Sequence, residues 1–121
     1  GRIEYRELPS YIAMGDLFAM PCRSRLMGLE VEGLGIVYLE ASACGLPVIA
    51  GRSGGAPDAV IHGETGFVVD GHDVDEIAQR AVELLKDEEK RQRLGQRGRE
   101  WVVSDWNWQI WSSKFNDLLG V

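Results

Sequence analysis

Short apolar runs alternate with longer amphipathic segments along this chain. Three runs have the length and composition of buried strands: Leu17 to Met20, Val48 to Ala50 and Phe67 to Val69. Between and after them lie glycine-rich turns and segments whose apolar residues recur with a helical period. This alternation is typical of a parallel sheet with helices packed on it. The sequence therefore predicts an α/β fold, a partial Rossmann-like parallel sheet with flanking helices.

The expected helices have recognisable boundaries. Gly45 marks the end of a helix that begins at about Gly35, because glycine is favoured just past a helix. Asp73 followed by Glu76 resembles a capping box before a strongly amphipathic segment. Ser104-Asp105 is expected to cap the last helix. The expected helices span residues 7–15, 35–44, 57–61, 73–86, 88–103 and 106–119.

Composition limits the class of protein. The chain has 121 residues, a formal charge of -6 and 45% hydrophobic content, which fits one soluble globular domain or part of one. We find no apolar run of about 18 residues and no leader segment, and we expect a cytoplasmic location. The acidic balance argues against nucleic-acid binding. Cys22 and Cys44 lack metal-ligand spacing and are expected to be small buried hydrophobes. Because three strands make a small sheet, we expect residues 1–121 to be part of a larger fold.

The stretch from Glu32 to Ala50 carries the main candidate chemistry. Glu32 precedes the turn Gly33-Leu34-Gly35, and a helix follows from about Ile36. Glycines let backbone N–H groups approach a ligand closely, and a helix start offers unpaired N–H groups and a positive dipole end to a diphosphate. Glu40 lies eight residues after Glu32. The sequence thus predicts an anion site flanked by two carboxylates.

The spacing of these two glutamates decides between functions. On one helix, eight residues span about 12 Å, whereas the two carboxylates of a retaining glycosidase lie roughly 5 Å apart. A long span fits the hydroxyl-bearing ends of one extended ligand better. The alternative is that Glu32 and Glu40 only favour the helix dipole and solvent. A dinucleotide site is disfavoured, since Tyr38 stands where the fingerprint requires a third glycine or alanine.

Other candidates have simpler explanations. Asp73-Val74-Asp75 could hold a divalent cation, but the capping interpretation is favoured. Arg23 and Arg25 lie in the loop before Glu32, where each either reaches a phosphate or faces solvent. The turn Ser53-Gly54-Gly55 is expected only to aim the next helix. Four tryptophans are expected to pack between helices, or to meet a partner domain outside this chain: Trp101, Trp106, Trp108 and Trp111.

Several motifs together resemble one known family. They are Glu32-Gly-x-Gly, the second glutamate Glu40, Glu-Ala-x-Ala-x-Gly-x-Pro-Val ending at Val48, and Gly54-Gly55-x-Pro57. This order is similar to that of the retaining glycosyltransferases of family 4, which have the GT-B fold of two facing Rossmann-like domains. The resemblance covers nearly the whole chain and implies that residues 1–121 are a carboxy-terminal, donor-binding domain portion. The residues around Glu32 most resemble those of actinobacterial phosphatidylinositol-mannoside mannosyltransferases that use GDP-mannose.

The resemblance implies roles for individual residues. Glu32 would bind hydroxyls of the donor sugar and is the candidate catalytic residue. Glu40 would bind the ribose hydroxyls, and the region around Ile3 would approach the nucleobase. With Arg25 added from its place in the loop, the expected donor-binding residues are Ile3, Arg25, Glu32, Gly33, Leu34, Gly35, Ile36 and Glu40.

The resemblance also implies partners. The nucleotide-sugar is a substrate, and no cofactor, metal or protein nucleophile is expected. A lipid acceptor would bind a separate amino-terminal domain, with peripheral attachment to the inner face of the plasma membrane. This chain alone is not expected to transfer sugar. Two alternatives stay open: a UDP-sugar-dependent transferase of the same fold, and a non-catalytic nucleotide-binding or assembly module.

Overall fold

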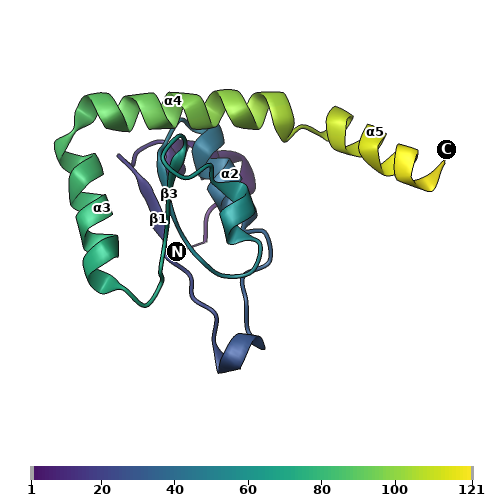
Figure 1. Ribbon diagram of the computed structural model, residues 1–121. Helices are drawn as coiled ribbons and strands as arrows, with labels where there is room; N and C mark the ends of the chain where they lie inside the picture. Colours follow the sequence, from purple (N-terminus) through teal and green to yellow (C-terminus); the bar gives the residue numbers. More distant parts are fainter. Residues whose placement is uncertain (1, 121) are drawn as a thin grey trace.

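The computed structural model describes residues 2–120. Its centre is a parallel three-stranded sheet in the order β1 (Phe18–Met20), β2 (Val48–Gly51) and β3 (Gly66–Val69) (Figure 1). In the register, Ala19 lies opposite Ile49, and Ile49 lies opposite Phe67. The predicted α/β class and the positions of all three strands are confirmed, but the expected burial of the first strand is wrong: Phe18 and Met20 are half-buried and Ala19 is exposed, because β1 is an edge strand of the sheet. Because the strands are parallel, their carboxyl ends lie along one edge of the sheet.

The helices follow the strands in the expected alternation. They are η1 (Tyr5–Glu7), α1 (Leu8–Ile12), η2 (Leu26–Gly28), α2 (Ile36–Ala43), η3 (Ala56–Ala59), α3 (Val74–Lys86), α4 (Glu88–Asp105) and α5 (Trp108–Leu119). The expected cap of α3 is confirmed, because the Asp73 carboxylate accepts a hydrogen bond from Glu76 N at 2.9 Å. Glu76 does not complete a capping box, since its carboxylate accepts from Asp70 N instead. Within residues 2–120, no helix has the length and apolar character needed to cross a bilayer.

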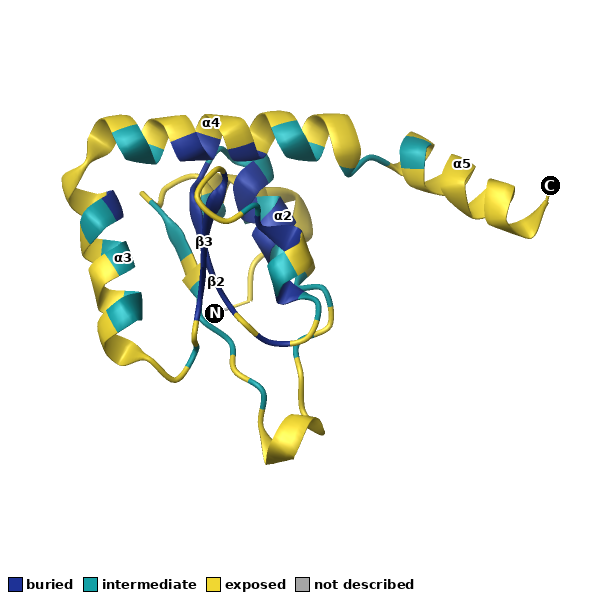
Figure 2. Cartoon of the chain, viewed as in Figure 1, coloured by how far each residue is buried: buried dark blue, intermediate teal, exposed yellow. Residues whose placement is uncertain are grey.

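The two faces of the sheet are covered by different helices. Along β2, Val48 and Ala50 face a cluster with α2 and η3, whereas Ile49 faces a second cluster with α3 and α4. This alternation makes all four residues of β2 buried, as expected for a parallel strand between two helical layers. α4 lies across both layers, and β2, β3 and the inner helix faces form the buried centre (Figure 2). The core therefore sits against the sheet, and its carboxyl edge is left to loops.

Two helix boundaries differ from the prediction. The helix expected over residues 7–15 is a 3-10 turn followed by the short α1, which has Pro9 in its first turn and ends at Ile12. The helix expected from Pro57 is also a 3-10 turn, η3. Proline supplies a helical φ but no backbone donor, so it permits a helix start without extending it.

The predicted cap of the last helix is wrong. α4 continues through Ser104-Asp105, and α5 begins after Asn107, whose side chain accepts from Ile110 N at 3.1 Å.

The tryptophans differ in burial. Trp106 is half-buried, and its ring meets that of Trp101 edge to face with 5.7 Å between the ring centres, as expected for packing. Trp108, however, is 84% exposed, because α5 leaves the body of the molecule after Asn107 (Figure 1).

A small charged network joins α3 to α4. The Glu83 carboxylate accepts hydrogen bonds from Lys90 and, at 2.9 Å, from Arg80. The Arg80 guanidinium also lies 4.5 Å from the centre of the Phe67 ring. The Lys90 and Arg80 hydrogen bonds lower the pKa of Glu83 below its usual 4.5. The network is therefore strongest when Glu83 is ionised.

Replacing Glu83 with Gln should lower the free energy of unfolding at pH 7 by about 1 kcal/mol, the upper range for a partly exposed ion pair. A lowered carboxyl pKa stabilises the fold above the unfolded value and loses that effect as the pH falls. The difference between the two proteins should therefore shrink below pH 4.5. Urea unfolding at pH 7 and pH 3 measures this, with the exposed Glu100→Gln as control. An equal difference at both pH values would contradict the ionic explanation.

Candidate functional site

The loop that leaves β1 crosses the carboxyl edge of the sheet. Its Cys22 carbonyl lies against Gly51 at the end of β2 and against Gly71 after β3, so closely that a Cβ at either glycine would overlap it. Only glycine permits such an approach between main chains. The loop is thus pressed onto the edge where ligands bind in open α/β folds. Cys22 itself is half-buried and packs against the core, so it is less buried than expected.

A second glycine turn holds the loop near its end. Gly55 N donates to Gly33 O at 2.7 Å, and Glu32 N donates to Ser53 Oγ at 3.2 Å. Gly54 has a φ of +53° and lies against the Glu32 carbonyl, where a Cβ would overlap. The turn at residues 53–55 therefore fixes the main chain of Glu32 as well as leading into η3. Consecutive glycines indicate a close approach, but their pattern does not say which segment approaches.

The start of α2 has the geometry of an anion site. Gly35 has a φ of 72° in the left-handed region, and α2 follows at Ile36 with no side-chain cap. The first N–H groups of an α-helix have no partners within the helix, and its start carries positive partial charge. Because no side chain among the described residues makes a cap hydrogen bond at this end of α2, the arrangement suits a phosphate group.

Tyr38 supports that helix start from beneath. Its ring is buried and lies against Gly35, where a Cβ would overlap the ring. Its hydroxyl donates to Met20 O at 2.8 Å and lies 3.2 Å from Cys22 Sγ. Burial, followed by the Cys22 thiol, raises the pKa of the Tyr38 hydroxyl well above its usual value, so the donor stays protonated. Tyr38 thereby ties the helix start to the end of β1, a role that sequence reasoning missed.

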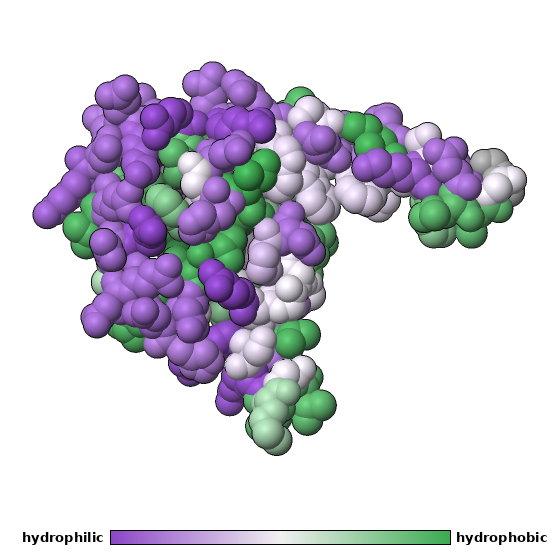
Figure 3. Space-filling view, viewed as in Figure 1, coloured by the Kyte–Doolittle hydropathy of each residue, from purple (hydrophilic) through white to green (hydrophobic). Residues whose placement is uncertain are grey.

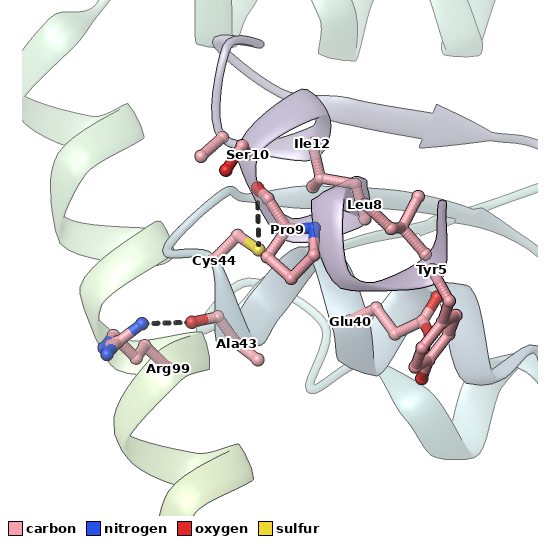
Figure 4. A pocket seen from close by; sticks show the side chains of 10 residues that line it. Tyr5, Leu8, Pro9, Ser10, Ile12, Glu40, Ala43, Cys44 and Arg99 are labelled. Carbon is pink, nitrogen blue, oxygen red and sulfur yellow. Dashed lines mark hydrogen bonds between the residues drawn. The ribbon is translucent and has the colours of Figure 1, made fainter. Parts of the chain in front are cut away.

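Glu40 lies on the wall of a pocket formed by α1, α2 and α4. The pocket has a volume of about 480 Å³, and Glu40 lies near Tyr5 at one end of it (Figure 4). Tyr5 OH donates to Glu40 Oε1 at 3.4 Å. At the other end, burial raises the pKa of the Cys44 thiol. A protonated thiol is a weak nucleophile. Cys44 is half-buried, which again corrects the expected burial.

Leu34 and Ile36 line a different hollow from Glu40. This second pocket, of about 530 Å³, also contains Leu39 and the indoles at the junction of α4 and α5. The expected site residues therefore do not share one closed cavity. Leu34 and Ile36 contribute apolar side chains to this second pocket and main chain to the start of α2.

Ile3 and Arg25 are less closely associated with the site. Ile3 lies before η1 and is 36% exposed. Arg25 Nε pairs with Glu30 Oε2 at 3.6 Å, in a protruding loop whose tip exposes apolar side chains (Figure 3). In the part of the chain that the structure describes, no hydrogen bond or ion pair links Ile3 or Arg25 to Glu32 or Glu40. Nor do the described residues contain a cluster of three metal-ligating side chains.

Solved structures share this fold. The chain superimposes on sucrose-phosphate synthase from Thermosynechococcus elongatus with a TM-score of 0.85 and 32% identity, over 98% of this chain and 28% of that chain. It also matches Anabaena HepE in complex with UDP, with a TM-score of 0.81 and 25% identity, over 95% of this chain and 30% of that chain. These neighbours define the class as GT-B glycosyltransferases.

Sequence comparison assigns the chain to a family within this class. The family model for glycosyl transferases group 1 matches residues 1–101, and the chain belongs to this family. A GDP-mannose-dependent phosphatidylinositol monomannoside mannosyltransferase of Mycolicibacterium smegmatis is 55% identical over 117 residues. A related enzyme of Corynebacterium glutamicum, specific by name for the monoacylated lipid, is 50% identical over 119 residues. The alignments cover 97% and 98% of this chain but only 31% of each relative.

Changing Gly35 to Ala should destabilise the fold more than changing Gly63 to Ala. Both glycines have positive φ, 72° and 82°, so each alanine carries the left-handed cost of about 1 to 2 kcal/mol. Only at Gly35 does the new Cβ also overlap the Tyr38 ring, because nothing lies within 4 Å of a Cβ at Gly63. Urea unfolding of both variants compares them. Equal losses would show that Tyr38 does not constrain the helix start.

Proposed function

We propose that this chain is the donor-binding part of a retaining mannosyltransferase that moves mannose from GDP-mannose to a phosphatidylinositol-mannoside lipid. The observation that carries the proposal is the uncapped start of α2 at Gly35, with Glu32 before it and Glu40 within the helix. The relatives at 55% and 50% identity are named for this donor and this class of acceptor, which supports the choice of sugar and lipid.

The geometry suggests how the donor would be held. The diphosphate would accept hydrogen bonds from the first N–H groups of α2, at Gly35 and Ile36. One oxygen of Glu32 accepts from Gly33 N at 3.2 Å, which leaves the other for a sugar hydroxyl. Glu40 would accept from the ribose hydroxyls in place of Tyr5, and the nucleobase would lie towards Ile3. With these contacts the donor would lie across the carboxyl edge of the sheet.

In this proposal the protein supplies position and charge stabilisation. The acceptor hydroxyl would attack the anomeric carbon from the face that the diphosphate leaves, and a donor phosphate oxygen would take the proton. Negative charge that develops on the departing diphosphate would meet the N–H groups and dipole of α2. Glu32 would act by orienting the sugar beside that centre. No metal, cofactor or protein nucleophile is part of the proposal.

The acceptor side belongs to the same proposal. Because the alignment covers 31% of the M. smegmatis relative, the acceptor would bind residues outside those described here. We place the reaction at the cytoplasmic face of the plasma membrane, since the relatives are named for a membrane lipid as acceptor. A UDP-sugar donor is the second candidate, which the likeness to HepE bound to UDP-glucose favours.

Titration with GDP, UDP and GDP-mannose tests the donor. The backbone amide signals of Gly35 and Ile36 in NMR spectra should shift with GDP and GDP-mannose, because the diphosphate lies against these N–H groups. A metal chelator should leave the affinity unchanged. Preference for UDP would overturn the mannose assignment. No response of these amides to any nucleotide would favour a non-catalytic module.

Replacing Glu40 with Ala should weaken binding of GDP by about 1 to 3 kcal/mol, the scale of hydrogen bonds to a charged group. Isothermal titration calorimetry measures the loss, and Glu89→Ala on the exposed face of α4 is the control. If Glu40→Ala binds GDP as the unchanged chain does, Glu40 is not part of the nucleotide site.

A further inference from the structure

Two serines join the ends of the loop that delivers Glu32. Ser53 is 2% exposed, and its Oγ lies 3.0 Å from Ser24 Oγ and accepts from Glu32 N at 3.2 Å. A hydroxyl has one proton to donate. Either hydroxyl of the pair can be the donor; because Ser53 is buried away from water, the arrangement in which it donates to Ser24 leaves its proton satisfied while a lone pair accepts from Glu32 N. One buried hydroxyl thus contacts both ends of the segment from Ser24 to Glu32.

The segment between these contacts is closed on itself. Arg25 N donates to Glu30 O at 2.8 Å, and Glu30 N donates back to Arg25 O at 3.2 Å. The loop therefore leaves and returns as a closed hairpin, and Ser53 ties its base to the turn after β2. A change in the Ser53 contact would move the returning arm, which ends at Glu32.

The Glu32 peptide is also held from its other side. Its carbonyl accepts from Gly55 N at 3.2 Å, and the next carbonyl, Gly33 O, accepts from the same N–H at 2.7 Å. Those two bonds are main chain to main chain, so replacing Ser53 or Ser24 removes none of their atoms. The bond to Glu32 N is different, because a side chain supplies it. The Ser53 side chain therefore supplies a contact to the Glu32 main chain that a substitution can remove.

We propose that Ser53 is a positioning residue for donor recognition: its buried hydroxyl, oriented by Ser24, sets the main chain of Glu32 and hence the place of its carboxylate. The inference rests on the proposed function, in which Glu32 binds the donor sugar. Ser53 itself touches no substrate. Loss of the Ser53 hydroxyl should weaken binding of the sugar portion of the donor. Binding of the nucleotide portion, which would contact α2 and Glu40, should not change.

Binding of GDP and of GDP-mannose to Ser53→Ala separates these portions. GDP-mannose binding should weaken about fivefold, the scale of one hydrogen bond, while GDP binding stays as in the unchanged chain. Ser24→Ala, which removes only the partner of the Ser53 proton, should act in the same direction. Ser42→Ala is the matched control, because Ser42 Oγ is buried and has no hydrogen-bond partner within residues 2–120. That variant should bind both ligands normally.

Equal weakening of GDP binding and GDP-mannose binding in Ser53→Ala would show a merely structural role, and unchanged GDP-mannose binding would also overturn the proposal.

Amide hydrogen exchange at Glu32 gives a readout that needs no ligand. The Glu32 N–H should be protected in the unchanged chain and in Ser42→Ala, and should exchange faster in Ser53→Ala and Ser24→Ala. If the Glu32 N–H exchanges faster in Ser53→Ala but the unchanged chain binds no nucleotide, the Ser53 contact stands and the proposed function is refuted. Unchanged exchange would refute the contact itself.

Discussion

The close approach of main chains at the carboxyl edge of the sheet is the constraint on which the site depends. The loop after β1 lies on Gly51 and Gly71, and its far end lies on Gly54 and Gly55. A side chain at any of these four positions would push the loop away from the sheet. Since this loop carries Glu32 and leads into α2, the same contacts place a carboxylate and a helix start beside each other.

The buried layers fix the remaining geometry. Tyr38 lies on the buried side of α2, and its hydroxyl reaches Met20 O at the end of β1. The ring beneath Gly35 thus couples the helix start to the central sheet. Across the other face, α3 and α4 bury Leu84 and Leu94 against Ile49. The core therefore supports α2, and among the described residues no side chain caps the N-terminus of this helix. The chain belongs to the glycosyl transferase group 1 family, and this helix start is the place where we propose that the donor diphosphate binds.

Much of this architecture follows from sequence pattern, and the reasons for the exceptions are physical. Three apolar runs predict the strands, and Gly45 predicts the end of α2, because burial and left-handed glycine leave local signals. The cap at Asn107 was missed because Ser104-Asp105 has the same capping chemistry, and only tertiary packing selects between them. The Tyr5 and Ser53 contacts were missed for another reason. Each joins residues far apart in the chain, which no local period encodes.

The central claim is that a donor diphosphate binds at the start of α2 between Glu32 and Glu40. A crystal structure of the protein with GDP-mannose tests it most directly. Phosphate oxygens should lie within hydrogen-bond distance of the Gly35 and Ile36 nitrogens, with the sugar against Glu32 and the ribose against Glu40. Nucleotide bound elsewhere, for example in the pocket lined by Trp106 and Trp111, with the start of α2 empty, would contradict it.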